Sequence, residues 1–186
     1  MTAMLLSELN RMAEADFTAA LGAVFEHSPW VAAQAAGSRP FADVAALHAA
    51  MVAEIEAAGT VAQLRLIRAH PELGGKLAVA GRLTAESTQE QAGAGLGQCS
   101  PQEFAELTEL NARYGATFGF PFILAVRGHN RQSIIAEFRR RIELTPEQEQ
   151  RESLQQIYRI GLLRLQDLLA EETQAVSRFF ESGFRL

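Results

Sequence analysis

A histidine stands at a sharp helix stop in the stretch IRAHPELGGKLA, residues 67–78. The apolar, helix-forming run before it ends at His70, because Pro71 cannot continue a helix. An imidazole titrates near neutral pH, so a histidine presented at such a stop suits general acid or base catalysis. The alternative is a helix end that merely happens to be histidine. His70 is therefore the first candidate for chemistry, with Pro71 beside it.

A polar face follows in LTAESTQEQAGAGL, residues 83–96. Ser87, Glu90 and Gln91 stand at i, i+3 and i+4, so on a helix they project from one side. A hydroxyl, a carboxylate and an amide together suit a ligand that carries ureido or amide groups. Ser87 and Glu90 also have the spacing of a capping box, which is the competing structural interpretation.

An arginine borders the apolar face of the expected C-terminal helix. Arg164 has Ile157, Ile160 and Leu168 at i−7, i−4 and i+4, whereas Arg159 lies on the opposite, polar side. A guanidinium in apolar surroundings needs an anionic or hydrogen-bonding partner. The other possibility is that its head reaches past the apolar face to solvent.

The other candidate patterns are weak. The four histidines, which also include His27, His48 and His129, show no metal-ligand spacing, and the single cysteine excludes a cysteine-based zinc site. That cysteine, Cys99, precedes a helix start, where we expect a buried or half-buried loop residue. AGAGLG follows no predicted strand and has no Lys-Ser/Thr after it, so it is interpreted as a loop. We expect neither a metal nor a phosphate-binding loop.

Helical periodicity dominates the elements that must position these residues. Two helix starts are strongly marked by capping boxes, each with a proline at the first helical position: Ser100 with Glu103, and Thr145 with Gln148. The helix that begins at Thr145 is expected to be the longest and to continue to about residue 180.

The stretch FGFPFILAV, residues 118–126, breaks the helical pattern. It is apolar and β-prone, but Gly119 and Pro121 interrupt it and no second strand is present to pair with it. A lone strand cannot satisfy its backbone polar groups, so we expect a buried, extended connector between helices. The predicted fold is therefore all-α, a single-domain helical bundle over residues 1–186.

Composition narrows the possible partners. The chain has 186 residues, of which 48% are hydrophobic and 21% charged, which is typical of a globular domain. Its net charge of -5 argues against a nucleic-acid partner. The one basic cluster, EFRRRIE at 137–143, is flanked by acids and is interpreted as a solvated helix face. Neither a secretion signal nor an apolar run of about 20 residues is found, so we expect a cytoplasmic protein without a membrane partner.

Several motifs in series carry a family resemblance. AHPELGG, LTAESTQEQAGAGL, LNARYGATFGFPFILAVRG and IYRIGLLRLQDLL follow one another, with FEHSPWVA and SRPF upstream. In this order and spacing they resemble the 2-oxo-4-hydroxy-4-carboxy-5-ureidoimidazoline (OHCU) decarboxylases of urate degradation, over about residues 7–172. The C-terminal SRFFESGFRL belongs to no recognised motif.

The resemblance implies a cofactor-independent all-α enzyme, usually a homodimer, that converts the small molecule OHCU to (S)-allantoin and carbon dioxide. It implies catalytic roles for His70, Glu90 and Arg164. The positions that it implies for substrate contact are Pro71, Ser87, Thr88, Gln89, Glu90, Gln91, Phe122, Ile123, Leu124, Ala125 and Val126.

Two other functions remain open at this stage. A ureide or cyclic amide hydrolase could use His70 as base and Glu90 as its partner, and would open a ring without releasing carbon dioxide. A non-catalytic helical binding module would tolerate alanine at both positions.

Overall fold

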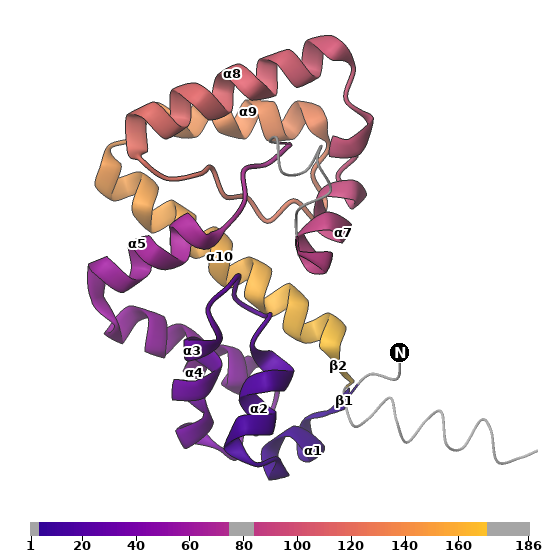
Figure 1. Ribbon diagram of the computed structural model, residues 1–186, viewed down its shortest axis with the longest axis vertical. Helices are drawn as coiled ribbons and strands as arrows, with labels where there is room; N and C mark the ends of the chain where they lie inside the picture. The colour runs from indigo at the N-terminus through magenta and orange to yellow at the C-terminus, as the bar shows by residue number, and fades with distance from the viewer. Residues whose placement is uncertain (1–3, 75–83, 171–186) are drawn as a thin grey trace, which may run out of the picture. The chain divides into compact units, whose positions relative to one another are not determined.

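Helices make up nearly all of the regular structure in the computed structural model, which describes residues 4–74 and 84–170 (Figure 1). The all-α prediction is confirmed. The described helices are α1 (Leu6–Arg11), α2 (Glu14–Leu21), α3 (Pro29–Ala35), α4 (Val44–Ala57), α5 (Gly59–Ala69), α7 (Ala85–Gly93), α8 (Pro101–Phe118), α9 (Arg131–Arg141) and α10 (Pro146–Leu168), with short 3-10 turns at Ala36–Ser38 and Leu96–Gln98.

Two short strands join the ends of the described chain. β1 (Met4–Leu5) pairs in parallel with β2 (Leu169–Ala170), Met4 opposite Leu169 and Leu5 opposite Ala170. This pairing ends α10 at Leu168, so the expectation that this helix continues through residues 169 and 170 is wrong. The rest of the expected helix, and the tail SRFFESGFRL, lie outside the described residues.

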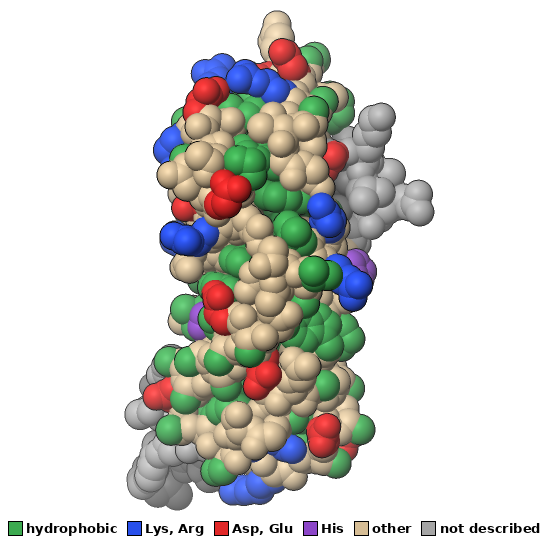
Figure 2. All heavy atoms as spheres, turned by 90° about the vertical axis from the view of Figure 1, so that its left-hand side faces the viewer, with side chains coloured by type: hydrophobic (Ala, Val, Ile, Leu, Met, Phe, Trp, Pro, Cys, Tyr) green, Lys and Arg blue, Asp and Glu red, His purple; other side chains and the backbone are tan. Residues whose placement is uncertain are grey.

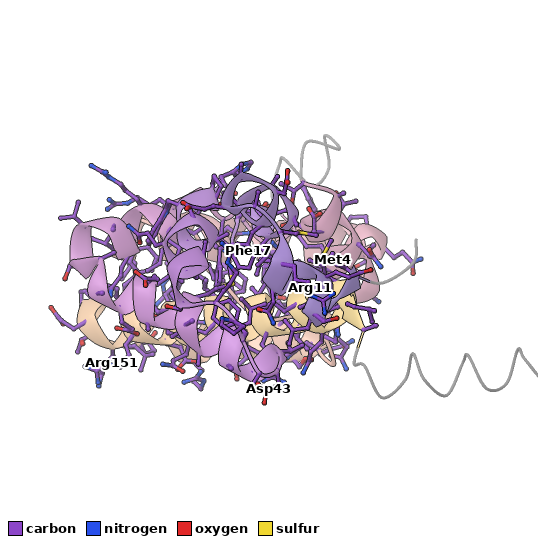
Figure 3. The ribbon with its side chains drawn as sticks, turned by 90° about the horizontal axis from the view of Figure 1, so that it is seen from below. Met4, Arg11, Phe17, Asp43 and Arg151 are labelled. Atoms are coloured by element: carbon purple, nitrogen blue, oxygen red, sulfur yellow. The ribbon has the colours of Figure 1, made fainter. Side chains whose placement is uncertain are left out.

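The contacts within the chain define two compact units, and each is described by itself. The first unit comprises residues up to Gly59 together with those from Ile160 onward. Its helices α2, α3 and α4 pack in sequence, and Asp43 caps α4 by accepting a hydrogen bond from the backbone N–H of Ala46 at 2.7 Å. Figure 3 shows Asp43 at the rim and Phe17 among the helices. The core is apolar and includes Leu9, Phe17, Leu21, Phe25, Val31, Leu47, Met51 and Ile55.

The second unit comprises residues Thr60 to Arg159. Helices α8 and α9 lie side by side in it (Figure 1). Tyr114 of α8 is the centre of an aromatic cluster, because its ring packs against the rings of Phe118, Phe120, Phe122 and Phe138 at centroid distances of 4.7, 6.0, 5.3 and 6.0 Å. This cluster buries the chain that follows α8.

Capping explains where α8 and α10 begin. Ser100 accepts from the backbone N–H of Glu103 at 3.2 Å, and the Glu103 carboxylate accepts from the backbone N–H of Ser100 at 2.8 Å. Thr145 and Gln148 form the same reciprocal pair at 3.3 and 3.0 Å. Both predicted capping boxes are therefore confirmed, and each satisfies backbone donors that a helix start would leave unpaired.

The predicted connector is also confirmed. Helix α8 ends at Phe118, and Gly119 adopts a left-handed conformation with φ +73°, which glycine adopts without strain. Residues 121–126 then run without a bend and outside any helix or strand. Phe122 to Val126 are all buried, so this irregular backbone lies inside the second unit.

No single helix within the described residues is long and apolar enough to cross a membrane. Helices α4 and α5 meet that criterion of length and composition only when they are taken together as a bent pair.

Candidate active site

His70 turns back onto the helix that it follows. Its backbone N–H donates to the Ile67 carbonyl at 3.2 Å, and its ring Nδ1 lies 2.9 Å from the carbonyl oxygen of Leu66. A carbonyl oxygen can only accept, so Nδ1 carries the hydrogen, and the neutral ring then has its lone pair on Nε2. The side chain is 7% exposed. The helix stop thus holds a buried imidazole in one tautomer, with Nε2 as its basic atom.

A pocket of about 490 Å³ opens where α5 ends. Arg68 closes part of its rim, because its Nε donates to the Gly119 carbonyl at 3.2 Å and so ties the end of α5 to the end of α8. Of the predicted site residues, His70 and Pro71 are among those that line the pocket. The described lining is Arg68, His70, Pro71, Glu72, Gly115, Gly119, Phe120 and Pro121.

Helix α7 begins three residues earlier than the capping-box interpretation requires. Thr84 is its N-cap and accepts from the backbone N–H of Ser87 at 3.3 Å, so Ser87 lies inside the first turn. The competing interpretation, a capping box that begins at Ser87, is therefore wrong, because Thr84 upstream starts the helix. Within α7, Ser87 and Gln91 are buried, Glu90 is half-buried, and Thr88 and Gln89 are exposed.

Gln91 connects α7 to the residues that follow His70. Its Oε1 accepts from the backbone N–H of Gly74 at 3.0 Å, and its Nε2 donates to the Glu72 carbonyl at 3.4 Å. Asn111 of α8 donates to the Leu73 carbonyl at 2.9 Å, next to these two contacts. Side-chain amides from two helices therefore hold the chain after the helix stop, and Gln91 brings two predicted regions together.

The connector segment Phe122 to Val126 is held from α9 and α10. Arg141 donates through Nη1 to the Ile123 carbonyl at 2.6 Å, and the Ala125 N–H donates to Oε1 of Gln156 at 3.0 Å. Two of the backbone groups in this segment thus already have partners in the protein.

Arg141 corrects the interpretation of EFRRRIE as a solvated face. Arg139 and Arg140 are exposed, but the Arg141 side chain is fully buried and pairs with the equally buried Glu149. Arg141 lies three residues after Phe138 and seven after Ile134, so it shares their buried face of α9, which is the signal that sequence inspection missed. On the face that Figure 2 shows, basic and acidic side chains are intermixed.

Arg164 belongs to the first unit, and its partner there is Glu26. Its Nη1 donates to Glu26 Oε2 at 3.0 Å and also lies 3.2 Å from the Ala23 carbonyl and 3.4 Å from that of Val24. The Arg164 residue is 8% exposed, so the snorkelling alternative is wrong. Glu26 is the acid of FEHSPWVA, where it lies between Phe25 and His27, and sequence inspection missed its role.

Cys99 is half-buried, as expected for a loop residue before a helix. Burial, and then the nearby Glu103 carboxylate, raise the pKa of its thiol, which disfavours the thiolate that a nucleophile needs. Within residues 4–74 and 84–170, no group of three His, Cys, Asp or Glu side chains is placed to hold a metal ion.

Comparison with known sequences connects this arrangement to one family. The family model for OHCU decarboxylase matches residues 10–166. The uric acid degradation bifunctional protein PucL of Bacillus subtilis is 42% identical over 91% of this chain, which spans 34% of that longer protein. The OHCU decarboxylase of Haloferax volcanii is 38% identical, over 90% of this chain and 97% of its own length. A putative OHCU decarboxylase of Homo sapiens is 40% identical, over 88% and 95%.

Solved structures agree with the sequence match. A crystal structure of (S)-allantoin synthase superposes with a TM-score of 0.70 at 28% identity, covering 89% of this chain and 54% of that one. A crystal structure of OHCU decarboxylase in the presence of (S)-allantoin superposes with a TM-score of 0.64 at 21% identity, which indicates a shared fold. The chain belongs to the OHCU decarboxylase family.

Proposed function

We propose that this chain decarboxylates OHCU to (S)-allantoin and carbon dioxide in urate degradation. The observation that carries the proposal is the family match over residues 10–166. His70, which lies within this range, is a buried imidazole with a defined tautomer. We further propose His70, Glu90 and Arg164 as catalytic residues. Pro71, the 87–91 segment and the 122–126 segment are proposed as substrate-contacting positions.

We expect this decarboxylation to need no cofactor. When carbon dioxide leaves, the electron pair of the broken carbon–carbon bond must be accepted by the conjugated ring of the substrate itself. The protein then has to position the ring, stabilise the developing anion and deliver a proton to one face of the product carbon. His70 suits the proton transfer, because the Leu66 carbonyl holds its Nδ1–H and so orients Nε2 as the atom that gains and gives a proton.

The decisive test follows the optical activity of freshly generated OHCU after the protein is added. OHCU decays by itself to racemic allantoin, so we expect the protein to accelerate the reaction and to yield predominantly the (S)-enantiomer. A racemic product that forms at the uncatalysed rate would contradict the proposal. Ring opening without carbon dioxide release would favour a hydrolase instead.

A homodimer and a cytoplasmic location belong to the same proposal. The homodimer follows from the family resemblance. The location follows from the sequence, in which no secretion signal was recognised and the single cysteine is compatible with a reducing compartment. Light scattering at working concentrations tests the dimer, and cell fractionation tests the location. That residues 1–186 act as one domain also stays a prediction, which a single cooperative unfolding transition would support.

A further inference from the structure

We infer that Arg141 and Gln156 are positioning residues, whose side chains hold the backbone of residues 122–126 in the conformation that binds substrate. The inference rests on the proposed function, because that proposal makes this segment a substrate-contacting one. Five consecutive buried residues outside any helix or strand need hydrogen-bond partners for their backbone. Here a guanidinium and a carboxamide supply two of them.

The two contacts fall on one edge of the segment. In an extended chain, the polar groups of residues i and i+2 point to the same side, and those of residue i+1 point to the other. The Ile123 carbonyl and the Ala125 N–H, which are bound by Arg141 and Gln156, are such an i and i+2 pair. Arg141 and Gln156 thus take the place of a neighbouring strand. In an extended segment the N–H and carbonyl of Leu124 point to the opposite edge, and we place the polar groups of the substrate there.

Arg141 is itself immobilised. Its Nε donates to both carboxylate oxygens of Glu149, at 2.9 and 3.1 Å, and its Nη2 donates to Glu149 and, at 3.1 Å, to Ser153. Tyr114 donates its hydroxyl hydrogen to the same carboxylate. The guanidinium also stacks 4.4 Å from the ring centroid of Phe122, so it contacts the connector through two neighbouring residues.

A contribution to folding stability does not by itself explain the buried Arg141–Glu149 ion pair. Arg141, Glu149 and Ser153 are each 0% exposed, and the cost of removing an ion pair from water offsets most of its attraction. A well-packed apolar cluster would stabilise the unit at least as well. The hydrogen bonds of Nε and Nη2 to Glu149 and Ser153 do fix the guanidinium in one orientation. Its remaining nitrogen, Nη1, is the one that holds the Ile123 carbonyl.

The carboxamide of Gln156 has a defined orientation for a similar reason. Its Nε2 donates to the Glu152 carboxylate at 3.1 Å, one helical turn earlier, so Oε1 is the atom directed at Ala125. Glutamate at this position keeps an oxygen for the Ala125 N–H but loses the donor to Glu152 and is repelled by that carboxylate, whereas methionine has nearly the same length and no strong acceptor. Gln155, its neighbour on the exposed side of α10, provides a matched control.

The experiment measures kcat and KM for OHCU in the full-length protein with Gln156→Met, Gln156→Glu, Gln155→Met and Arg141→Lys. Loss of a contact that binds substrate in both ground and transition states raises KM and leaves kcat nearly unchanged. We expect Gln156→Met to raise KM at least about fivefold with kcat within about twofold, and Gln156→Glu, which keeps one acceptor, to raise KM less than Gln156→Met does. Gln155→Met should behave as wild type.

A purely structural role gives a different pattern, because partial unfolding lowers the apparent kcat with the folded fraction and leaves KM unchanged. If the wild type turns OHCU over but Gln156→Met leaves KM unchanged, this inference is wrong and the proposed function is unaffected. A wild type without stereoselective turnover would remove the proposed function and this inference with it. Arg141→Lys should raise KM further, and if that variant fails to fold, Gln156→Met still decides.

Discussion

Arg164 and Glu26 form a buried ion pair although 138 residues separate them in the chain. Their side chains are 7% and 2% exposed, and the Nη1–Oε2 distance is 3.0 Å. The Ala23 and Val24 carbonyls add two acceptors from the same loop between α2 and α3. A flexible arginine side chain is thereby held in one orientation, which is the condition that a catalytic guanidinium has to meet.

Replacing the carboxylate tests the importance of that orientation. Glu26→Gln keeps the shape of the side chain but removes its charge, so the Arg164 guanidinium loses its charge-assisted partner at a cost of about 1.5–3 kcal/mol. We expect a lower free energy of unfolding and a lower turnover of OHCU. Urea unfolding and kinetics on fresh substrate measure the two effects, and wild-type values for both would show that Glu26 does not hold Arg164.

Arg164 can be compared with Arg159 on the same helix. Lysine cannot reproduce the planar fork of donors, so Arg164→Lys should lower turnover at least tenfold, or about 1.4 kcal/mol. Arg159 is exposed, and Arg159→Lys should stay within about 0.5 kcal/mol of wild type. Equal, small effects of both substitutions on turnover would contradict a catalytic role for Arg164.

His70→Asn separates the orienting contact of the imidazole from its basic atom. An asparagine amide can still donate toward the Leu66 carbonyl, but it has no counterpart of the Nε2 lone pair. We expect turnover to be lost while the far-UV circular dichroism spectrum and the melting temperature stay near those of wild type. Wild-type activity in this variant would rule out the proposed role of His70, and an unfolded variant would favour a structural one.

Local signals carried most of the fold prediction. The capping boxes at Ser100 and Thr145 and the break after Phe118 depend on neighbours within four residues, and the structure confirms all three features. The end of α10 depends on strand pairing with Met4 and Leu5, which local periodicity does not register. The start of α7 could not be fixed from the sequence, because Thr84 and Ser87 are both good caps.

The sequence allowed the candidate site residues to be predicted, but not the residues that they contact. The types and spacings identified His70 as a residue at a helix stop and Arg164 as an arginine that needs a partner. The partner itself, Glu26, comes from a distant loop, and the Arg141–Glu149 pair joins two different helices. Only tertiary structure brings such groups together, and a charge run such as EFRRRIE does not reveal which of its members is buried.

Gly161→Ala tests the packing beside Arg164. A Cβ at this position would lie 2.7 and 2.8 Å from the Cζ and Cε1 atoms of Phe25, which is only 1% exposed, so one of the two groups must shift within the packed core. We expect a loss of about 1–3 kcal/mol in the free energy of unfolding from overpacking. Gly115→Ala is the matched control, because that helical glycine has nothing within 4 Å of a Cβ and should gain up to about 1 kcal/mol. A stable Gly161→Ala protein would contradict this close contact.

Metal chelation tests the expected independence from cofactors. Because the substrate ring can accept the electron pair itself, we expect prolonged dialysis against EDTA to leave kcat and KM for OHCU unchanged. The dialysed protein should be compared with a sample to which zinc or magnesium is added back. Activity that disappears in EDTA and returns with one metal would require a metal-dependent mechanism.

Tyr114→Phe tests the buried network at alkaline pH. Burial, and then the hydrogen bond to Glu149, raise the pKa of the Tyr114 hydroxyl well above its ordinary value near 10. Below pH 10 the hydroxyl keeps its proton in both states, and the variant should be less stable by about 1–3 kcal/mol because the Glu149 carboxylate loses a donor.

Above pH 10 the unfolded wild-type chain releases a proton that the native state still holds. The free energy of unfolding of the wild type should then fall by about 1.4 kcal/mol per pH unit relative to Tyr114→Phe, and the stability gap should narrow. The other titrating groups are shared by both proteins and cancel in the difference. Urea unfolding followed by far-UV circular dichroism between pH 8 and about pH 11 measures this difference in the free energy of unfolding. A gap that stays constant over this range would mean that Tyr114 ionises in the native state as readily as in the unfolded chain.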